Sequence, residues 1–215
     1  MIRRAAAEFV GTFFLVLTVC ATGLAGAPLA PLAIGGVLAA MVFATGHISG
    51  GHLNPAVTLA VWLRGRLSAR DAGPYAAAQL VGGLAAAGVA RLVYDDSLAA
   101  PVDVSGRGLV AAFAVELLFT FALAFVVLNV ATSRDHPNNS FYGLAIGLTV
   151  LAGAVAVGGI SGGAFNPAVG IGVCLAGLAR WSMLWIYLVA TLAGGAAAAL
   201  AFRALNPGDV AQPAR

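Results

Sequence analysis

The chain alternates between long apolar stretches and short polar segments over almost its whole length. Such stretches are typical of membrane-spanning helices, because a bilayer core of about 30 Å requires roughly 20 helical residues. We expect six spanning helices. They cover residues 5–26, 32–45, 74–94, 111–131, 141–157 and 181–205.

Two shorter apolar segments each follow a glycine-rich loop. One loop reads ISGGHLNPAV over residues 48–57, and the other reads ISGGAFNPAV over residues 160–169. Asn is favoured at a helix N-cap and Pro at the first helical position. Each motif therefore predicts a helix that opens at Asn54 or at Asn166.

Both short helices end early. Arg64-Gly65 interrupts the first and Gly177 the second, after about ten residues or ~15 Å, which is about half of a bilayer core. Two half-helices at corresponding places in two halves of a sequence indicate a substrate path near the membrane midplane.

The two halves of the chain repeat one plan. The segment around Glu8 matches the segment around Glu116, the two glycine-rich loops match each other, and residues 80–83 match residues 192–195. Glu8 and this repeat also argue against a signal peptide at the N-terminus. Because each half has an odd number of spans, we expect the halves to be inverted relative to each other. These inverted repeats cover about residues 1–102 and 103–215 of a single transmembrane domain.

The basic residues set the expected orientation. All 11 are arginine, and most fall in connections on one side of this topology. Basic residues favour the cytoplasmic side, so we expect both termini there and the protein in the inner or plasma membrane. Residues 95–107 then form an external linker, and the tail 206–215 is expected to be disordered. Trp181, Trp185 and Tyr187 are expected to anchor the last span at the membrane interface.

Composition narrows the class of protein. Hydrophobic residues make up 61% of the 215 positions and charged residues 9%, which indicates an integral membrane protein in contact with the lipid bilayer. Membrane topology accounts for most of the arginines, so the net charge of +3 does not indicate a nucleic-acid partner. Cys20 and Cys174 lie in apolar runs and are interpreted as buried small hydrophobic residues.

Two NPA tripeptides, in the loops GHISGGHLNPAVT and SGGAFNPA, resemble the aquaporin or major intrinsic protein family. The resemblance covers essentially the whole chain. It implies an all-α membrane protein of aquaporin-like fold, with six transmembrane helices and two re-entrant half-helices. It also implies a passive channel that is not an enzyme, uses no cofactor and assembles as a homotetramer. We expect small-residue faces such as Gly82-Gly83 and Gly194-Gly195 to help that assembly.

The loops carry the expected pore chemistry. Irregular backbone at membrane depth persists where it lines a water-filled cavity or is buried in protein. We expect the two asparagines to cap their own helices while offering side-chain N–H groups to the pore. The NPA residues are Asn54, Pro55, Ala56, Asn166, Pro167 and Ala168. The backbone carbonyls expected to face the lumen are those of Gly50, Gly51, His52, Gly162, Gly163 and Ala164.

Glu8 and Glu116 are carboxylates inside expected spans, where a charge is costly. One interpretation is a proton relay. The favoured interpretation is that each accepts hydrogen bonds from the nearby loop and braces it. His47 and His52 have no carboxylate or thiol ligand near them in the sequence, so we expect no metal site.

The expected selectivity filter departs from the family. Most members have Arg directly after the second NPA, and this chain has Val169. Spacing from the NPA motifs places Ile34, Ala154 and Gly163 at the other filter positions. The usual aromatic, histidine and arginine are thus all absent, which predicts a wide apolar constriction.

These features predict a passive channel for water and small neutral solutes, such as glycerol-like polyols or metalloid hydroxides like arsenite. A strict water channel is the main alternative. A proton-coupled secondary transporter and a non-conducting structural assembly are less favoured, because paired NPA motifs are expected of a channel.

Overall fold

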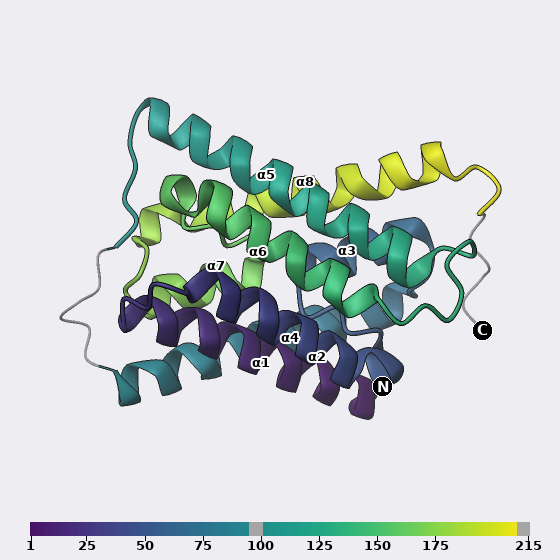
Figure 1. Cartoon of the computed structure of the whole chain (residues 1–215), viewed down its shortest axis with the longest axis horizontal. Helices are drawn as coiled ribbons and strands as arrows, with labels where there is room; N and C mark the ends of the chain where they lie inside the picture. The colour runs from purple at the N-terminus through teal and green to yellow at the C-terminus, as the bar shows by residue number, and fades with distance from the viewer. Residues whose placement is uncertain (95–100, 210–215) are drawn as a thin grey trace.

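A computed structural model describes residues 1–94 and 101–209 of the chain. Six of its helices, counting η2 with α5 and η3 with α8, are long and apolar enough to cross a membrane, as predicted. Figure 1 shows these helices running roughly along the long axis of the molecule. The elements are α1 (Ile2–Leu24), α2 (Ala30–Ser49), α3 (Pro55–Arg64), α4 (Ala69–Val93), α5 (Arg107–Val127), the π-helical η2 (Leu128–Thr132), α6 (Tyr142–Ser161), α7 (Pro167–Leu175), the 3₁₀ turn η3 (Trp181–Met183) and α8 (Leu184–Leu205).

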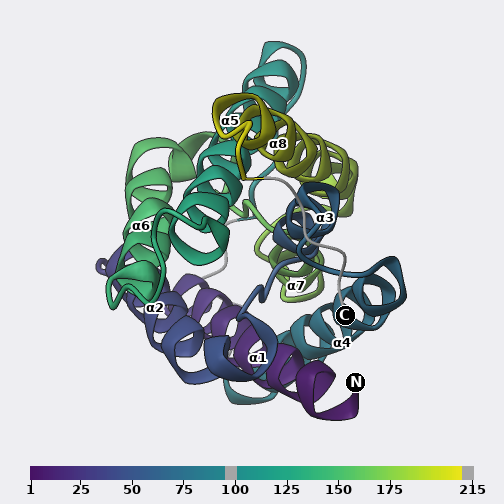
Figure 2. The ribbon, with the colours of Figure 1, turned by 90° about the vertical axis from the view of Figure 1, so that its right-hand side faces the viewer.

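The short helices α3 and α7 lie between the long ones, as the end-on view in Figure 2 shows. α1 packs against α4 and α2, and α5 packs against α8 and α6. α3 contacts α8, while α7 contacts α4, so each short helix rests on the last long helix of the other half. The start of α1 and the end of α8 lie at the same end of the bundle, called here the termini end (Figure 1).

Both short helices have the predicted bounds. α3 ends at Arg64, and the next residue, Gly65, has a φ of 89° and gives the left-handed cap that glycine provides without steric cost. α7 ends at Leu175, just before Gly177, as expected.

Several predicted helix boundaries were wrong by about one turn. α2 continues to Ser49 and α6 to Ser161, each ending at a left-handed glycine, Gly50 or Gly162. The sequence prediction ended both helices at the first small or polar residues, but these still make helical hydrogen bonds. α4 begins at Ala69, because the Ser68 side chain caps it by accepting from the Asp71 backbone N–H.

The paired glycines serve contacts within the subunit. A Cβ on Gly82 would meet the Phe9 carbonyl oxygen at 2.7 Å, and one on Gly83 would meet the Ala168 carbonyl oxygen at 2.8 Å. Gly194 and Gly195 meet backbone of α5 and α3 in the same way. The expectation that these glycines form faces for assembly was therefore wrong, because backbone of the same chain occupies the space beside each of them.

Tyr187 was wrongly predicted to be an interface anchor. Its side chain is fully buried, and its hydroxyl donates to the Ser161 carbonyl at 2.6 Å. Tyr75, at the equivalent place in the first half, is also buried and donates to the Ser49 carbonyl at 2.8 Å. Trp181 is exposed, as an anchor would be.

The expected linker and the expected tail both contain residues with defined contacts. In the linker, residues 95–100 lie outside the described part, but Val102 forms a parallel bridge with Ala179 next to the end of α7. In the tail, residues 210–215 lie outside the described part, but Asp209 makes ion pairs with Arg64 and Arg66. The prediction that the tail is disordered from residue 206 was therefore wrong.

Candidate functional site

Asn54 and Asn166 connect the two glycine-rich loops at the centre of the molecule. The Asn54 side-chain oxygen accepts from the Ala56 backbone N–H at 2.8 Å, and its amide nitrogen donates to the Phe165 carbonyl at 2.9 Å. Asn166 accepts from the Ala168 backbone N–H at 2.9 Å and donates to the Leu53 carbonyl at 2.9 Å. Because a side-chain amide carries two N–H groups, each asparagine keeps a second donor.

The N-termini of α3 and α7 therefore face each other. Pro55 and Pro167 occupy their first positions, and Ala56 and Ala168 are fully buried. Each helix N-terminus is equivalent to roughly half a positive charge. Two such ends at one point make the centre of the protein unfavourable for cations.

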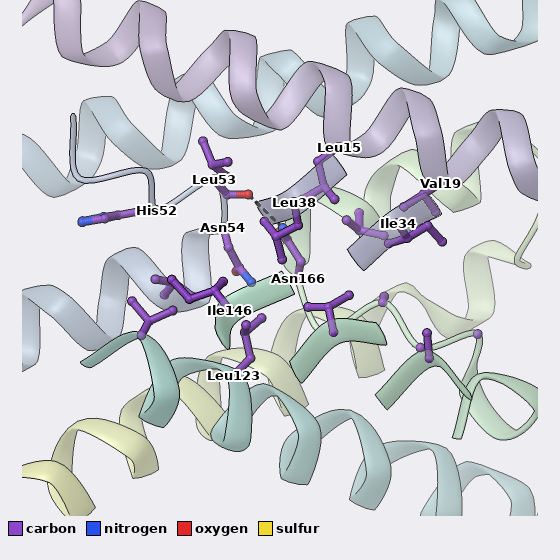
Figure 3. A pocket seen from close by; sticks show the side chains of 18 residues that line it. Leu15, Val19, Ile34, Leu38, His52, Leu53, Asn54, Leu123, Ile146 and Asn166 are labelled. Carbon is purple, nitrogen blue, oxygen red and sulfur yellow. Dashed lines mark hydrogen bonds between the residues drawn. The ribbon is translucent and has the colours of Figure 1, made fainter. Parts of the chain in front are cut away.

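A narrow cavity of about 50 Å³ passes this point. A single buried water requires roughly 10–15 Å³ on the same measure, so the cavity has room for a few waters. Figure 3 shows Asn54 and Asn166 near the middle of the lining, with His52 at one end and Val19 and Ile34 at the other.

The lining of this cavity is mostly aliphatic. Among its described residues, the polar side chains are those of His52, Asn54 and Asn166. The four residues expected to form the filter all line it. They are Ile34, Ala154, Gly163 and Val169.

Only some of the residues whose backbone carbonyls were expected to face the lumen line this cavity. His52, Gly162, Gly163 and Ala164 line it. Gly50 instead borders a second hollow, of about 560 Å³, at the termini end. Gly51 is buried against α2, beside Thr45, and therefore does not line the cavity as expected.

Sequence analysis missed the aliphatic residues that α1 and α5 contribute. Leu15 and Val19 line the cavity from α1, and Leu123 and Val127 do so from α5. The signal was present in the sequence, because both pairs follow a buried glutamate by seven and eleven residues, and these spacings keep to one helix face.

Glu8 is fully buried and holds the first loop. Its carboxylate accepts from the Ser49 hydroxyl at 2.6 Å, from the backbone N–H of His52 at 3.0 Å and of Leu53 at 2.6 Å, and from the Gln79 side chain at 2.8 Å. These four donors occupy both oxygens.

Glu116 holds the second loop in the same way. It accepts from the Ser161 hydroxyl at 2.7 Å and from the backbone N–H of Ala164 at 2.9 Å and of Phe165 at 2.7 Å. Like Glu8, it does not line the cavity. The two carboxylates are thus placed where a brace is needed and away from a path along the cavity.

The braced residues have an unusual backbone. Leu53 and Phe165 have φ of 52° and 49°, a left-handed conformation that is costly for non-glycine residues. Each donates its own backbone N–H to the glutamate of its half. The carboxylates therefore stabilise the turn that brings the Leu53 and Phe165 carbonyls to the opposite asparagine.

The hollow at the termini end lies next to this cavity. His52 and Val127 border both spaces, and Arg4, Arg66 and His136 are among the residues around the larger one. The His52 ring is held by a 3.2 Å contact between Nδ1 and the Thr58 hydroxyl.

Comparisons with known proteins agree on one family. Residues 1–202 match the model of the major intrinsic protein family. The chain is 39% identical to "Glycerol uptake facilitator protein-like 6" of Lactiplantibacillus plantarum, over 96% of this chain and 100% of that protein. It is 37% identical to "Aquaporin NIP1-4" of Oryza sativa subsp. japonica, over 91% of this chain and 74% of that protein. The aquaglyceroporin of Plasmodium falciparum has the same fold, with a TM-score of 0.77 at 22% identity over 94% of this chain and 95% of that one.

Proposed function

Because the chain belongs to the major intrinsic protein family of membrane channels, we propose that it passes water and small neutral solutes passively in both directions. The observation that carries this proposal is the reciprocal pair of hydrogen bonds from Asn54 and Asn166 beside a narrow, mostly aliphatic cavity.

The centre of the pore excludes ions in this proposal. The facing ends of α3 and α7 repel cations, and the second N–H of each asparagine donates to a passing oxygen. A water molecule that accepts from these N–H groups directs its own hydrogens away from them, which interrupts a chain of waters that would otherwise conduct protons. The NPA residues and the carbonyls of the two loops together supply the polar contacts.

The filter admits solutes larger than water. Ile34, Ala154, Gly163 and Val169 are small or aliphatic and carry no fixed charge. Glycerol-like polyols and metalloid hydroxides such as arsenite are neutral and small enough to be candidates. The name of the relative from Lactiplantibacillus plantarum, a glycerol uptake facilitator-like protein, agrees with this class.

A strict water channel is the second candidate, and the small cavity volume of about 50 Å³ favours it. The absence of an arginine at residue 169 favours the broader solute class, because a cationic side chain there would narrow the pore. Among the residues that the structure describes, those that line the cavity include no carboxylate, which argues against a proton-coupled transporter.

The assembly and topology follow from the same proposal. The chain is one transmembrane domain of two inverted repeats, placed in the inner or plasma membrane with both termini in the cytoplasm. The termini end is then the cytoplasmic mouth. Four subunits assemble, each with its own pore.

Stopped-flow light scattering on proteoliposomes tests this function. We expect water and glycerol fluxes with a low activation energy, no saturation and no dependence on a proton gradient. Water flux without glycerol or metalloid flux would select the strict water channel. Saturable flux that follows a proton gradient would overturn the proposal in favour of a transporter.

A further inference from the structure

Three arginines converge on the carboxylate of Asp209. Arg64 Nη2 lies 2.7 Å from one oxygen, and Arg66 Nη2 lies 3.2 Å from the other. Arg134 contacts the same group twice, through its backbone N–H at 3.0 Å and through Nε at 3.4 Å. We call Asp209 and these three arginines the Asp209 clasp.

The central pair of the clasp is buried. The side chain of Arg64 is 0% exposed and that of Asp209 is 5% exposed. The Arg64 guanidinium also donates to the Thr132 hydroxyl at 2.7 Å and to the Thr132 carbonyl at 2.9 Å, and it lies 4.6 Å from the centre of the Phe202 ring. A buried cation needs a compensating anion, and Asp209 is the carboxylate that contacts it.

The clasp joins segments that are far apart in the sequence. Arg64 is the last residue of α3, Arg66 lies in the connection to α4, and Arg134 follows η2. Asp209 follows α8, so one carboxylate links the half-helix that begins at Asn54 to the ends of two long helices.

The same segments border the mouth of the pore. Arg66, Thr132 and Ser133 line the hollow of about 560 Å³ at the termini end, together with Asn138 of the loop over residues 133–141. The clasp therefore lies directly behind one wall of this hollow.

At the opposite end of the protein, backbone hydrogen bonds and an exposed ion pair hold the segment after α4 beside the end of α7. Val102 donates to the Leu178 carbonyl at 2.9 Å and accepts from the Arg180 backbone N–H at 3.1 Å, next to the end of α7. Asp103 pairs with Arg180 at 2.8 Å. Thus the segment after α4 secures the outer end of α7, and the segment after α8 secures the outer end of α3.

We propose that Asp209 is a positioning residue of the pore, which fixes the far end of α3 and the loop over residues 133–141 at the mouth of the termini end. Its effect on flux rests on the proposed channel function, whereas its effect on the loop does not. Without the carboxylate, Arg66 and Arg134 repel each other and the loop is released over the hollow, so that flux per folded channel falls.

The main test compares Asp209→Asn with two matched variants in detergent and in proteoliposomes. Asp135→Asn removes the same charge from an exposed position in the loop, and Asp209→Glu keeps the charge. Hydrogen–deuterium exchange over residues 133–141 reports the loop, and exchange over α4 reports global folding. For Asp209→Asn we expect exchange in the loop about tenfold faster, since the charged acceptor of the Arg134 backbone N–H and the ion pair with the Arg134 guanidinium are lost, with a loss of water flux per folded channel. Asp135→Asn keeps wild-type values, and Asp209→Glu restores both.

A second variant covers the case in which an unpaired buried Arg64 prevents folding. Arg64→Met combined with Asp209→Asn removes both buried charges, and such replacements are often tolerated. We expect the same fast exchange and reduced flux. Wild-type exchange in both variants, or fast exchange with unchanged flux, would overturn the proposal. A wild-type protein that conducts no solute would instead contradict the channel function and leave the exchange result valid.

Discussion

Asn54 and Asn166 each donate a hydrogen bond to the carbonyl of the residue directly before the other, at 2.9 Å in both cases. This reciprocal pair ties the two loops together at the point where α3 and α7 begin. It also fixes where the positive helix ends meet, so the proposed exclusion of ions rests on this geometry and not on the filter residues.

Replacing Asn166 with Asp tests that explanation. A carboxylate beside the two helix ends offsets their positive potential and removes an N–H donor. We expect Asn166→Asp to conduct Na⁺ in planar bilayers, whereas wild-type protein does not. Measurable Na⁺ conductance in the wild type would show that a filter without arginine fails to exclude cations.

The two glutamates are expected to act on folding and not on transport. Glu116→Gln replaces one carboxylate oxygen, an acceptor, with an NH₂ group, which is a donor. The carboxylate of Glu116 accepts from one hydroxyl and two backbone N–H groups, so the substitution leaves donors unpaired at a cost of about 1–3 kcal/mol each. Yield of folded protein should fall, with flux per channel preserved and independent of pH. Flux that titrates with pH and disappears in well-folded Glu116→Gln protein would support a proton relay.

Gly195 is expected to tolerate no side chain. A Cβ there meets the Ala56 carbonyl oxygen and displaces α3, and overpacking of this kind costs about 1–3 kcal/mol. Gly88→Ala in α4 is the control, because nothing lies within 4 Å of its added Cβ. Gly195→Ala should lower the apparent melting temperature, and Gly88→Ala should keep or raise it. Equal melting temperatures for the two variants would show that the contact of α8 with α3 is looser than described.

The clasp is expected to stay closed over the physiological pH range. Burial raises the pKa of Asp209, but the Arg134 backbone N–H and the guanidinium groups of Arg64 and Arg66 outweigh it and bring that pKa below its usual value. Arg203 lines a separate surface hollow together with Arg64 and Asp209, and it adds positive charge near the carboxylate.

A carboxyl group whose pKa is lowered in the folded protein stabilises the folded state at pH values above the ordinary carboxyl pKa. This stabilisation is lost as the pH falls through the lowered pKa. The rate of hydrogen–deuterium exchange over residues 133–141, corrected for intrinsic rates, should therefore stay low between about pH 5 and 8. It should rise only below about pH 4. Opening near pH 6 would assign the change to another group, such as a histidine.

The parts of the structure that local chemistry decides could be predicted from the sequence. Asn54-Pro55 and Asn166-Pro167 specify helix starts, and repetition of the motif showed that both starts belong to one site. The bracing role of Glu8 was also accessible, because a buried carboxylate needs donors and the loop supplies them.

Contacts between distant segments could not be predicted in this way. The composition of the tail that contains Asp209 is polar and rich in turn-forming residues, which favours disorder. The contact that places Asp209 is made with a buried Arg64 that lies 145 residues away. Tyrosine is a residue type that is common at membrane interfaces, which led to the wrong prediction for Tyr187. Its burial depends on how α8 packs. Such outcomes are set by tertiary packing, which a single sequence does not reveal.

In the proposed channel, the aliphatic filter, with Val169 in place of arginine, lets solutes larger than water pass. Val169 is 4% exposed and lies beside the cavity with Gly163 and Ala154. An arginine there adds volume and fixed donors to a lumen with small neighbours, so the pore should narrow without closing.

The most direct measurement is the ratio of glycerol to water permeability for wild type and Val169→Arg in proteoliposomes, normalised to folded protein. Normalisation is needed because a guanidinium in an apolar ring lowers yield. For Val169→Arg we predict that glycerol flux falls about tenfold, equivalent to roughly 1.4 kcal/mol in the barrier, while water flux stays measurable. An unchanged ratio, whether both fluxes persist or both are lost together, would contradict it.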